Sequence, residues 1–240
     1  MSEKARFVYF LLKRKESGGT IPPITGACVS NARMATQPIS ISTKMHSIKI
    51  LRPSADQVSM YLKRWDTLDN YVLQESSLRK LFAKTYPKNG EMDDVLIKVC
   101  SLNDFYSTNI FSPFTVAKHI VDLDIDQRLG NRDLALVNDI AVVKVNGQKT
   151  INFYSFATKY CSHHFPEDYP IYDSFVEKML MHFKRVDKFY KFKKDDLKHY
   201  PTYHAILMEF SRFYGLEGFT LKEVDKYLWQ AGKEYFPKQY

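Results

Sequence analysis

The feature that most constrains this chain is the helical spacing of its apolar residues, which continues from about Met45 to the C-terminus. After Pro53, Ser54 is suited to cap a helix whose apolar stripe recurs at i, i+3, i+4 and i+7. The stripe consists of Val58, Tyr61, Leu62 and Trp65. The pattern predicts an amphipathic helix, one of a series along the chain.

Further helices are predicted wherever the same period returns between prolines and glycines. They cover residues 71–84, 92–105, a segment that begins at Pro113, 125–129, 133–140, a segment that begins near Phe153 and ends before Pro166, a segment capped by Ser174 and Glu177, 203–214, and 221–235 after Thr220. The predicted fold class is therefore mainly α, a single multi-helix domain over residues 45–240.

One segment departs from the helical period. Val142–Val145 and Lys149–Ile151 flank Asn146 and Gly147, and an Asn-Gly pair between short apolar runs is the strongest short signal for a type I′ β-hairpin. We expect this short β-hairpin to be the only β structure.

Residues 1–44 have neither period and are rich in Gly, Ser, Thr and Pro from Ser17 onward, so we interpret them as a disordered leader, with Met45 as an alternative start. They hold seven Lys/Arg against two Glu, which leaves 28 Lys/Arg against 25 Asp/Glu for the rest of a chain whose net charge is +8. Overall basicity is thus a weak indication of a polyanionic partner, and only a local cluster of charge would count.

A cytoplasmic protein is the simplest expectation. The apolar run Phe7–Leu12 is too short for a membrane span or a signal-peptide core, and the three cysteines show no paired spacing. Motifs for nucleotide phosphates, dinucleotides, zinc proteases and serine hydrolases are missing from the sequence, so those classes have no support.

The most informative segment is NFYSFATKYCSHHFPEDYPIYDS, residues 152–174. It resembles the catalytic region of the helix-hairpin-helix DNA glycosylases, especially a diverged branch similar to 8-oxoguanine DNA glycosylases. The resemblance is specific over residues 152–180 and loose over residues 92–235. In that family a lysine nucleophile lies on the helix after the hairpin, and an aspartate opens the next helix; Lys159 and Asp173 match these two roles.

The resemblance implies a base-excision DNA glycosylase that acts on a flipped damaged base in double-stranded DNA, with AP-lyase activity through a lysine Schiff base and no cofactor. A lysine attacks only as a neutral amine, and burial against Phe156 and Tyr160 would lower the pKa of Lys159. Two alternatives stay open for the pair. Lys159 fits an ordinary lysine that reaches out to solvent, and Asp173 fits a helix N-cap.

A second segment, YSTNIFSPFTVAK (residues 106–118), is similar to the part of the family in which a polar side chain fills the gap left by the flipped base. The resemblance assigns that role to Asn109 and adds Lys118 to the candidate nucleic-acid-binding residues. A turn residue before the helix at Pro113 is the alternative for Asn109. The hairpin contributes Gly147 and Lys149, although it has one glycine where the family has a Gly-x-Gly turn.

A basic strip extends from Lys178 to His199, with eight Lys/Arg against three aspartates. Four aromatic residues are interleaved, at positions 183, 189, 190 and 192. Such a strip is suited to contact phosphates and stack on bases, with Lys184, Arg185 and Lys188 as candidates. The alternative is a solvated linker whose aromatic residues lie in the core.

Four residues raise the question of zinc, namely Cys161, His163, His164 and His204. Adjacent histidines on a helix point about 100° apart, so we expect no metal site. Two other functions remain open beside the glycosylase: a non-catalytic nucleic-acid-binding domain of the same fold, and a helical protein-interaction module.

Overall fold

The computed structural model describes residues 50–145 and 149–237, which belong to one compact unit, Ser47–Tyr240. The expected leader and the turn at Asn146 and Gly147 lie outside the described residues. In chain order, the elements are α2 (Ala55–Trp65), α3 (Asp69–Lys80), the π-helical turn η1 (Leu81–Thr85), α4 (Met92–Tyr106), α5 (Pro113–Asp122), α6 (Asp126–Gly130), α7 (Leu136–Ala141), β1 (Val142–Val145), β2 (Lys149–Asn152), α8 (Tyr154–His164), α9 (Ser174–Asp187), the 3₁₀ turn η2 (Asp195–Lys198), α10 (Tyr200–Phe213) and α11 (Leu221–Tyr235).

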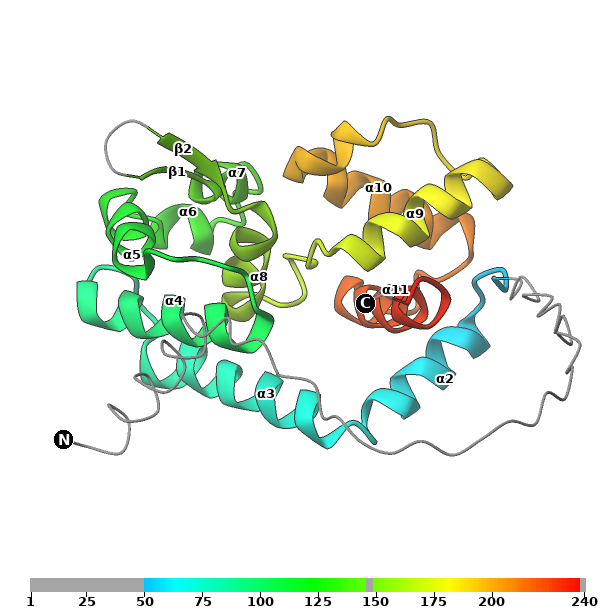
Figure 1. Ribbon diagram of the computed structural model, residues 1–240. Coiled ribbons are helices and arrows are strands. Elements are labelled where there is room, and N and C mark those ends of the chain that lie inside the picture. Colours follow the sequence, from blue (N-terminus) through cyan, green and yellow to red (C-terminus); the bar gives the residue numbers. More distant parts are fainter. Residues whose placement is uncertain (1–49, 146–148, 238–240) are drawn as a thin grey trace, which may run out of the picture. The chain divides into compact units, whose positions relative to one another are not determined.

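The predicted fold class is confirmed, because the described residues are mainly helical and carry one short antiparallel hairpin (Figure 1). Its register pairs Val142 with Asn152 and Val145 with Lys149. The hairpin leads directly into α8, where the Phe153 amide donates to the Ala141 carbonyl at 2.8 Å. The strands therefore fix the start of the helix that carries Lys159.

Local capping explains where several helices begin and end. Ser54 caps α2 by accepting from the Gln57 amide at 3.3 Å, and Thr220 and Glu223 form a capping box at the start of α11. Pro113 occupies the first turn of α5, where its missing N–H costs nothing. Gly215 has a φ of +65° just after α10, a conformation that favours glycine.

One predicted cap is wrong. The N-cap of α9 is Asp173, whose carboxylate accepts from the Phe175 amide at 2.8 Å, while Ser174 is already the first helical residue. Glu177 closes no capping box, because it is the fourth helical residue after Asp173 rather than the third, and its carboxylate accepts from the Tyr172 hydroxyl. The sequence contains two adjacent residues that are good caps, and tertiary bonds decide between them.

Segments far apart in the sequence pack side by side (Figure 1). Helix α11 lies against both α2 and α9, so the first and last described helices share one core. The rings of Tyr61 on α2 and Tyr227 on α11 lie 5.4 Å apart, and both side chains are buried. Helix α11 lies even closer to α9. A Cβ atom added at Gly232 of α11 would lie 2.7 Å from the Cβ of Phe175 on α9.

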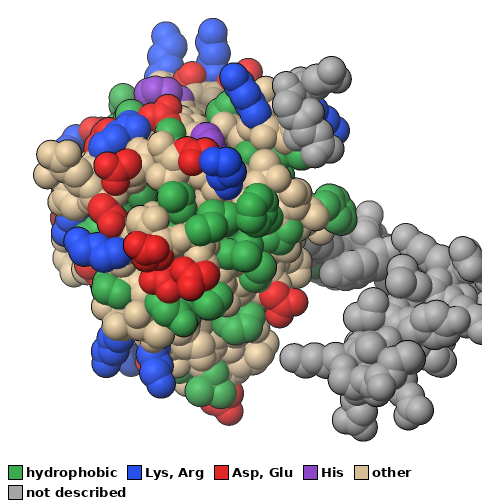
Figure 2. Space-filling view, turned by 90° about the vertical axis from the view of Figure 1, so that its left-hand side faces the viewer, with side chains coloured by type: hydrophobic (Ala, Val, Ile, Leu, Met, Phe, Trp, Pro, Cys, Tyr) green, Lys and Arg blue, Asp and Glu red, His purple; other side chains and the backbone are tan. Residues whose placement is uncertain are grey.

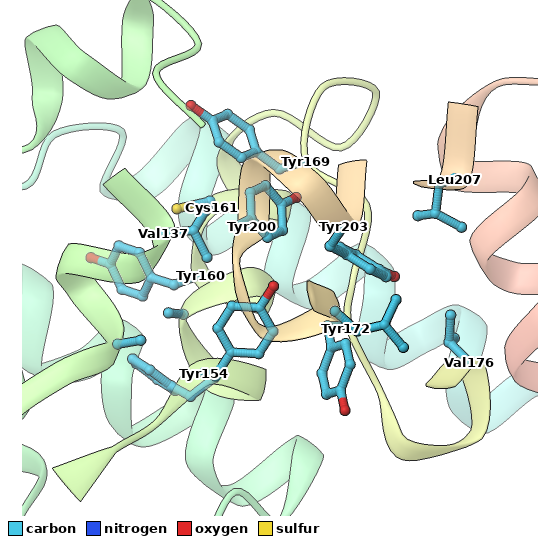
Figure 3. Close-up of a cluster of buried hydrophobic side chains, with 14 of the residues drawn as sticks. Val137, Tyr154, Tyr160, Cys161, Tyr169, Tyr172, Val176, Tyr200, Tyr203 and Leu207 are labelled. Atoms are coloured by element: carbon cyan, nitrogen blue, oxygen red, sulfur yellow. The ribbon is translucent and has the colours of Figure 1, made fainter. Parts of the chain in front are cut away.

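A cluster of buried tyrosines holds the connection between α8 and α9 (Figure 3). The hydroxyl of Tyr200 donates to the Pro170 carbonyl at 2.8 Å, and the hydroxyl of Tyr203 donates to the Ile171 carbonyl at 2.7 Å. Both tyrosines lie on α10. This helix thereby fixes the loop that leads into Asp173.

Across the described ranges, every helix is too short or too polar to cross a membrane. This observation does not test the expected cytoplasmic location, which stays a prediction.

Candidate functional site

A cavity of about 540 Å³ is bordered by α2, α3, the end of α4, α8, the start of α9 and α11. Both residues singled out from the sequence, Lys159 and Asp173, line it. Its volume lies in the range of pockets that bind small organic ligands. The cavity is the best candidate for a functional site in the described part of the chain.

Lys159 lies in the middle of α8 and is only 4% exposed. Its Nζ atom donates to the hydroxyl of Ser155 at 2.5 Å and to the Ser155 carbonyl at 3.2 Å. Burial lowers the pKa of Lys159 to about 8, although the carboxylates of Asp173 and Asp225 act in the opposite direction. The alternative of a lysine that reaches solvent is therefore wrong, and a substantial fraction of this amine is neutral near pH 7.5.

Tyr106 forms a wall beside this amine. The Lys159 Nζ atom lies 5.2 Å from the centroid of the Tyr106 ring, and the Tyr106 hydroxyl lies 3.0 Å from Nε2 of His163. Burial holds the pKa of His163 well below its usual range, so the ring is neutral and either atom of the pair can donate according to the tautomer. This contact between α4 and α8 fixes the position of the tyrosine over the lysine.

Asp173 has a structural role as the N-cap of α9, and it also lines the cavity. Its placement depends on the preceding residues, which are held from several sides. The Tyr172 amide donates to Oγ1 of Thr158, and the Ile171 amide donates to Oδ2 of Asp225, each at 3.2 Å. Capping and a contribution to the cavity are therefore compatible in this one side chain.

Asp225, on α11, is a carboxylate that the sequence reasoning missed. It is 4% exposed, lines the cavity, and lies 3.7 Å from the ammonium group of Lys222. Burial raises the pKa of Asp225 to about 6, while Lys222 and the bond from the Ile171 amide oppose that shift. Strongly perturbed groups that meet in one cavity are typical of functional sites.

The rest of the cavity wall is mainly aromatic and charged. It comprises Trp65, Tyr71 and Trp229 together with Glu75, Lys226 and Lys233. Lys226 forms an ion pair with Glu75 at 2.7 Å. Lys222, Asp225, Lys226, Trp229 and Lys233 all lie on one face of α11, since their spacing is i, i+3, i+4, i+7 and i+11. That spacing of polar and aromatic residues was the sequence signal that would have found them.

The basic strip from Lys178 to His199 does not line this cavity. Phe183, Phe189 and Phe192 are buried, so only Tyr190 among its four aromatic residues is available to stack on a base. The prediction for the other three rings is wrong, because they belong to the core around α9 and α10. Among the three candidate cations, Lys184 is partly buried with its amine 5.1 Å from the Phe192 ring, Arg185 is exposed, and Lys188 is exposed and ends α9 at a φ of +54°.

The loop between α4 and α5 is held by one side chain. Asn103 accepts from the Ile110 amide and the Thr108 hydroxyl, each at 2.9 Å, and donates to the Ile110 carbonyl at 3.0 Å. Asn109 is exposed in this loop with a φ of +58°, a conformation that fits a loop residue before α5, and the gap-filling role stays a prediction. The next exposed side chain is Phe111, at 95%.

Figure 2 views the described residues from the side of α4 and α5 and shows exposed hydrophobic side chains gathered among charged ones. The exposed apolar side chains of these two helices and their loop include Ile97, Phe111 and Phe114. Single exposed apolar residues are common, whereas a group of them indicates a contact surface.

The other candidates take simple positions. Lys118 forms an exposed ion pair with Asp122 at 2.9 Å, Lys149 is exposed at the start of β2, and Gly147 lies outside the described residues. No group of three or more His, Cys, Asp or Glu side chains with metal-binding geometry occurs in the described ranges. The adjacent histidines point to different partners, His163 to Tyr106 and His164 to Asn89.

Comparison with known proteins places this chain in a family. An uncharacterized protein from Haemophilus influenzae is 49% identical over 148 residues, which cover 61% of this chain and 70% of that protein. The chain belongs to the family of this Haemophilus influenzae protein. A family model named HI_0787_N and described as an N-terminal domain matches residues 57–168, from α2 to the loop after α8. This match includes Lys159 and ends before Asp173 and α11. No solved structure matches the chain.

Proposed function

We propose that the protein is a DNA glycosylase that excises a damaged base, with Lys159 as the nucleophile and AP-lyase activity through a Schiff base. The observation that carries the proposal is the position of the Lys159 amine. It is buried, has a pKa of about 8, and lies in the same cavity as two carboxylates, those of Asp173 and Asp225. A neutral amine beside carboxylates is what attack on a sugar carbon requires.

In this mechanism the lone pair of Lys159 Nζ forms a bond to C1′ of a flipped nucleotide. The electrons of the C1′–N bond leave with the base, which takes up a proton from solvent. The carboxylate of Asp173 stabilises the positive charge that develops on the sugar. The new secondary ammonium then loses a proton, and the C1′–O4′ bond breaks as O4′ takes up a proton, which gives the Schiff base from which β-elimination cleaves the strand.

DNA reaches the cavity beside the loop between α4 and α5. Phe105, Tyr106 and Ser107 line the cavity, and the same chain segment continues into the exposed Asn109 and Phe111. Because Asn103 holds this loop rigidly, an apolar ring at its tip is suited to enter the base stack next to a flipped nucleotide. We therefore propose double-stranded DNA as the partner, and the loop rather than the basic strip as the main contact near the site.

The compartment we propose is the cytoplasm. Cys100 and Cys161 are both free thiols, and unpaired cysteines are typical of a reducing environment.

Borohydride trapping tests the chemistry. Duplex oligonucleotides with an abasic site, or with oxidised, deaminated or alkylated bases, are incubated with the full chain and reduced. A covalent adduct is expected in the wild type and none in Lys159→Ala, while Lys80→Ala, an exposed lysine on α3, serves as the matched control. An equal yield from Lys159→Ala, or no adduct with any duplex, would exclude Lys159 as the nucleophile.

DNA binding that is unaffected by Lys159→Ala and steeply dependent on salt would then indicate a non-catalytic nucleic-acid-binding domain.

A further inference from the structure

The end of the cavity that α2 and α3 border is an aromatic cluster, which consists of Trp65, Tyr71 and Trp229 from three different helices. The ring centroids lie 5.1 Å apart for Tyr71 and Trp229, and 5.8 Å apart for Trp65 with each of the other two. All three side chains are only partly buried. The cluster therefore presents ring surface to whatever enters the cavity.

Two ammonium groups already lie over these rings. Nζ of Lys226 is 4.7 Å from the Trp65 ring centroid, and Nζ of Lys233 is 4.4 Å from that of Trp229 and 5.0 Å from that of Tyr71. Lys233 also donates to the Tyr71 hydroxyl at 2.8 Å. The two lysines therefore already make the cation–π contacts that these rings could offer to a cationic ligand.

The carboxylates of the cavity do not restore a preference for a cation at this end. Three carboxylates line the cavity. Glu75 is paired with Lys226 at 2.7 Å, Asp225 lies 3.7 Å from Lys222, and Asp173 accepts from the Phe175 amide at 2.8 Å as the N-cap of α9. Within the described residues Lys233 has no carboxylate partner within 4.0 Å, so it adds a positive charge that is not compensated.

Helix α11 shows how a ligand would span the site. Asp225, Trp229 and Lys233 follow one another on the same face, and a helical rise of 1.5 Å per residue places Trp229 about 6 Å and Lys233 about 12 Å along the axis from Asp225. Because Lys159 and the aromatic cluster line the same cavity, a nucleotide with its sugar near Lys159 can place its base against the cluster.

We infer that this aromatic end binds a planar ring that is uncharged and rejects one that carries a positive charge. The inference rests on the proposed function in taking the ring to be a nucleobase. An uncharged ring gains stacking and dispersion against the tryptophans, whereas a cationic ring is repelled by the two ammonium groups. Bases that alkylation has made cationic are then poor substrates, and uncharged modified bases are good ones.

Two isomeric nucleosides isolate the charge. At pH 7, 1-methyladenosine is a cation and N6-methyladenosine is neutral, although the two differ only in the position of one methyl group and in one proton. Trp65 and Trp229 are the two tryptophans of the chain, so quenching of tryptophan fluorescence reports on this cluster directly. N6-methyladenosine is expected to bind the full chain about tenfold more tightly than its isomer.

Two variants test whether the lysines cause the preference. Lys233→Met keeps an apolar stem over the rings and is expected to reduce the ratio severalfold. The double variant Lys226→Met/Lys233→Met also removes the ion-pair partner of Glu75. In this variant the binding preference should reverse, so that 1-methyladenosine binds more tightly than N6-methyladenosine. Lys63→Met, at an exposed position on α2, is the matched control and should leave the ratio unchanged.

Equal or tighter binding of 1-methyladenosine to the wild type would overturn the inference, and so would a lack of quenching by either nucleoside. Neither result depends on covalent chemistry. Borohydride trapping through Lys159 reports on the proposed function separately, so the two can fail independently.

Discussion

The Nζ atom of Lys159 lies 5.2 Å from the centroid of the Tyr106 ring, at the point where the end of α4 meets α8. The ring covers an amine that is only 4% exposed and whose hydrogen bonds within the described residues go to Ser155, one turn earlier on its own helix. No carboxylate of the described residues lies within 4.0 Å of it. A lysine held in this way weakens the fold and favours the neutral amine.

We predict that Lys159→Met raises the free energy of unfolding at pH 7 by about 2 kcal/mol, because it removes a buried charge and keeps the packing. The folded-state pKa of about 8 lies below the 10.5 of an unperturbed lysine. Between these two values the unfolded chain binds more protons, so stability rises with pH across this window. Urea unfolding at pH 7 and pH 9.5 measures both effects, and the rise should be smaller in the variant.

Lys98→Met is the informative control, since burial lowers the pKa of Lys98 to about 8 as well. Lys98 donates to the Asn89 side chain at 2.6 Å and to the carbonyls of Lys88 and Tyr86 at 2.7 and 3.1 Å. Its loss removes the donor to the Lys88 and Tyr86 carbonyls, although the Asn89 oxygen keeps the bond from the Tyr160 hydroxyl at 2.6 Å, so stability should fall by about 3 kcal/mol. A similar fall for Lys159→Met would show that Lys159 is structural.

Asp173 offers a way to separate capping from chemistry. Asn is as good an N-cap as Asp, so Asp173→Asn should change the free energy of unfolding by less than about 0.5 kcal/mol, whereas Asp173→Ala should lower it by about 1 kcal/mol. The Asn variant lacks the negative charge, and we expect the rate of borohydride trapping to fall about 100-fold. A trapping rate equal to that of the wild type would leave Asp173 as a cap alone.

The sequence predicted the helices well because their signals are local. Ser54, Pro113 and Thr220 each start a helix where the pattern placed it. Lys159 and Asp173 were also found from one continuous segment. The sequence offered both Asp173 and Ser174 as the cap of α9, and the structure confirms Asp173, whose position depends on bonds that Tyr172 and Ile171 make to other helices.

The other half of the site was missed for a related reason. Asp225 and Trp229 lie more than fifty residues after Asp173, and only the packing of α11 against α2 and α9 brings them to the cavity. The basic strip shows the converse error. Its density of Lys and Arg was visible in the sequence. Phe189 and Phe192 are buried and cannot stack on bases, and their burial depends on tertiary contacts.

Gly232 tests the packing that carries α11 to the cavity. Gly232→Ala would place a Cβ atom 2.7 Å from Cβ and 2.8 Å from the carbonyl oxygen of Phe175, and backbone cannot move aside easily. We expect a loss of about 2 kcal/mol in the free energy of unfolding. Gly218→Ala, where no atom lies within 4 Å of the added Cβ, is the control and should be nearly neutral. Equal effects at both glycines would contradict the close approach of α9 and α11.

Phe111 allows the DNA contact to be tested apart from stability. Because its side chain is 95% exposed, Phe111→Ala should change the free energy of unfolding by less than about 0.5 kcal/mol. A ring that enters the base stack contributes about 1–3 kcal/mol, so affinity for a duplex with an abasic site should fall about tenfold. Fluorescence anisotropy at fixed salt measures this, with Met208→Ala, an exposed apolar residue on α10, as the control. Unchanged affinity in Phe111→Ala would separate the loop from DNA and favour a protein partner for the exposed apolar side chains around it.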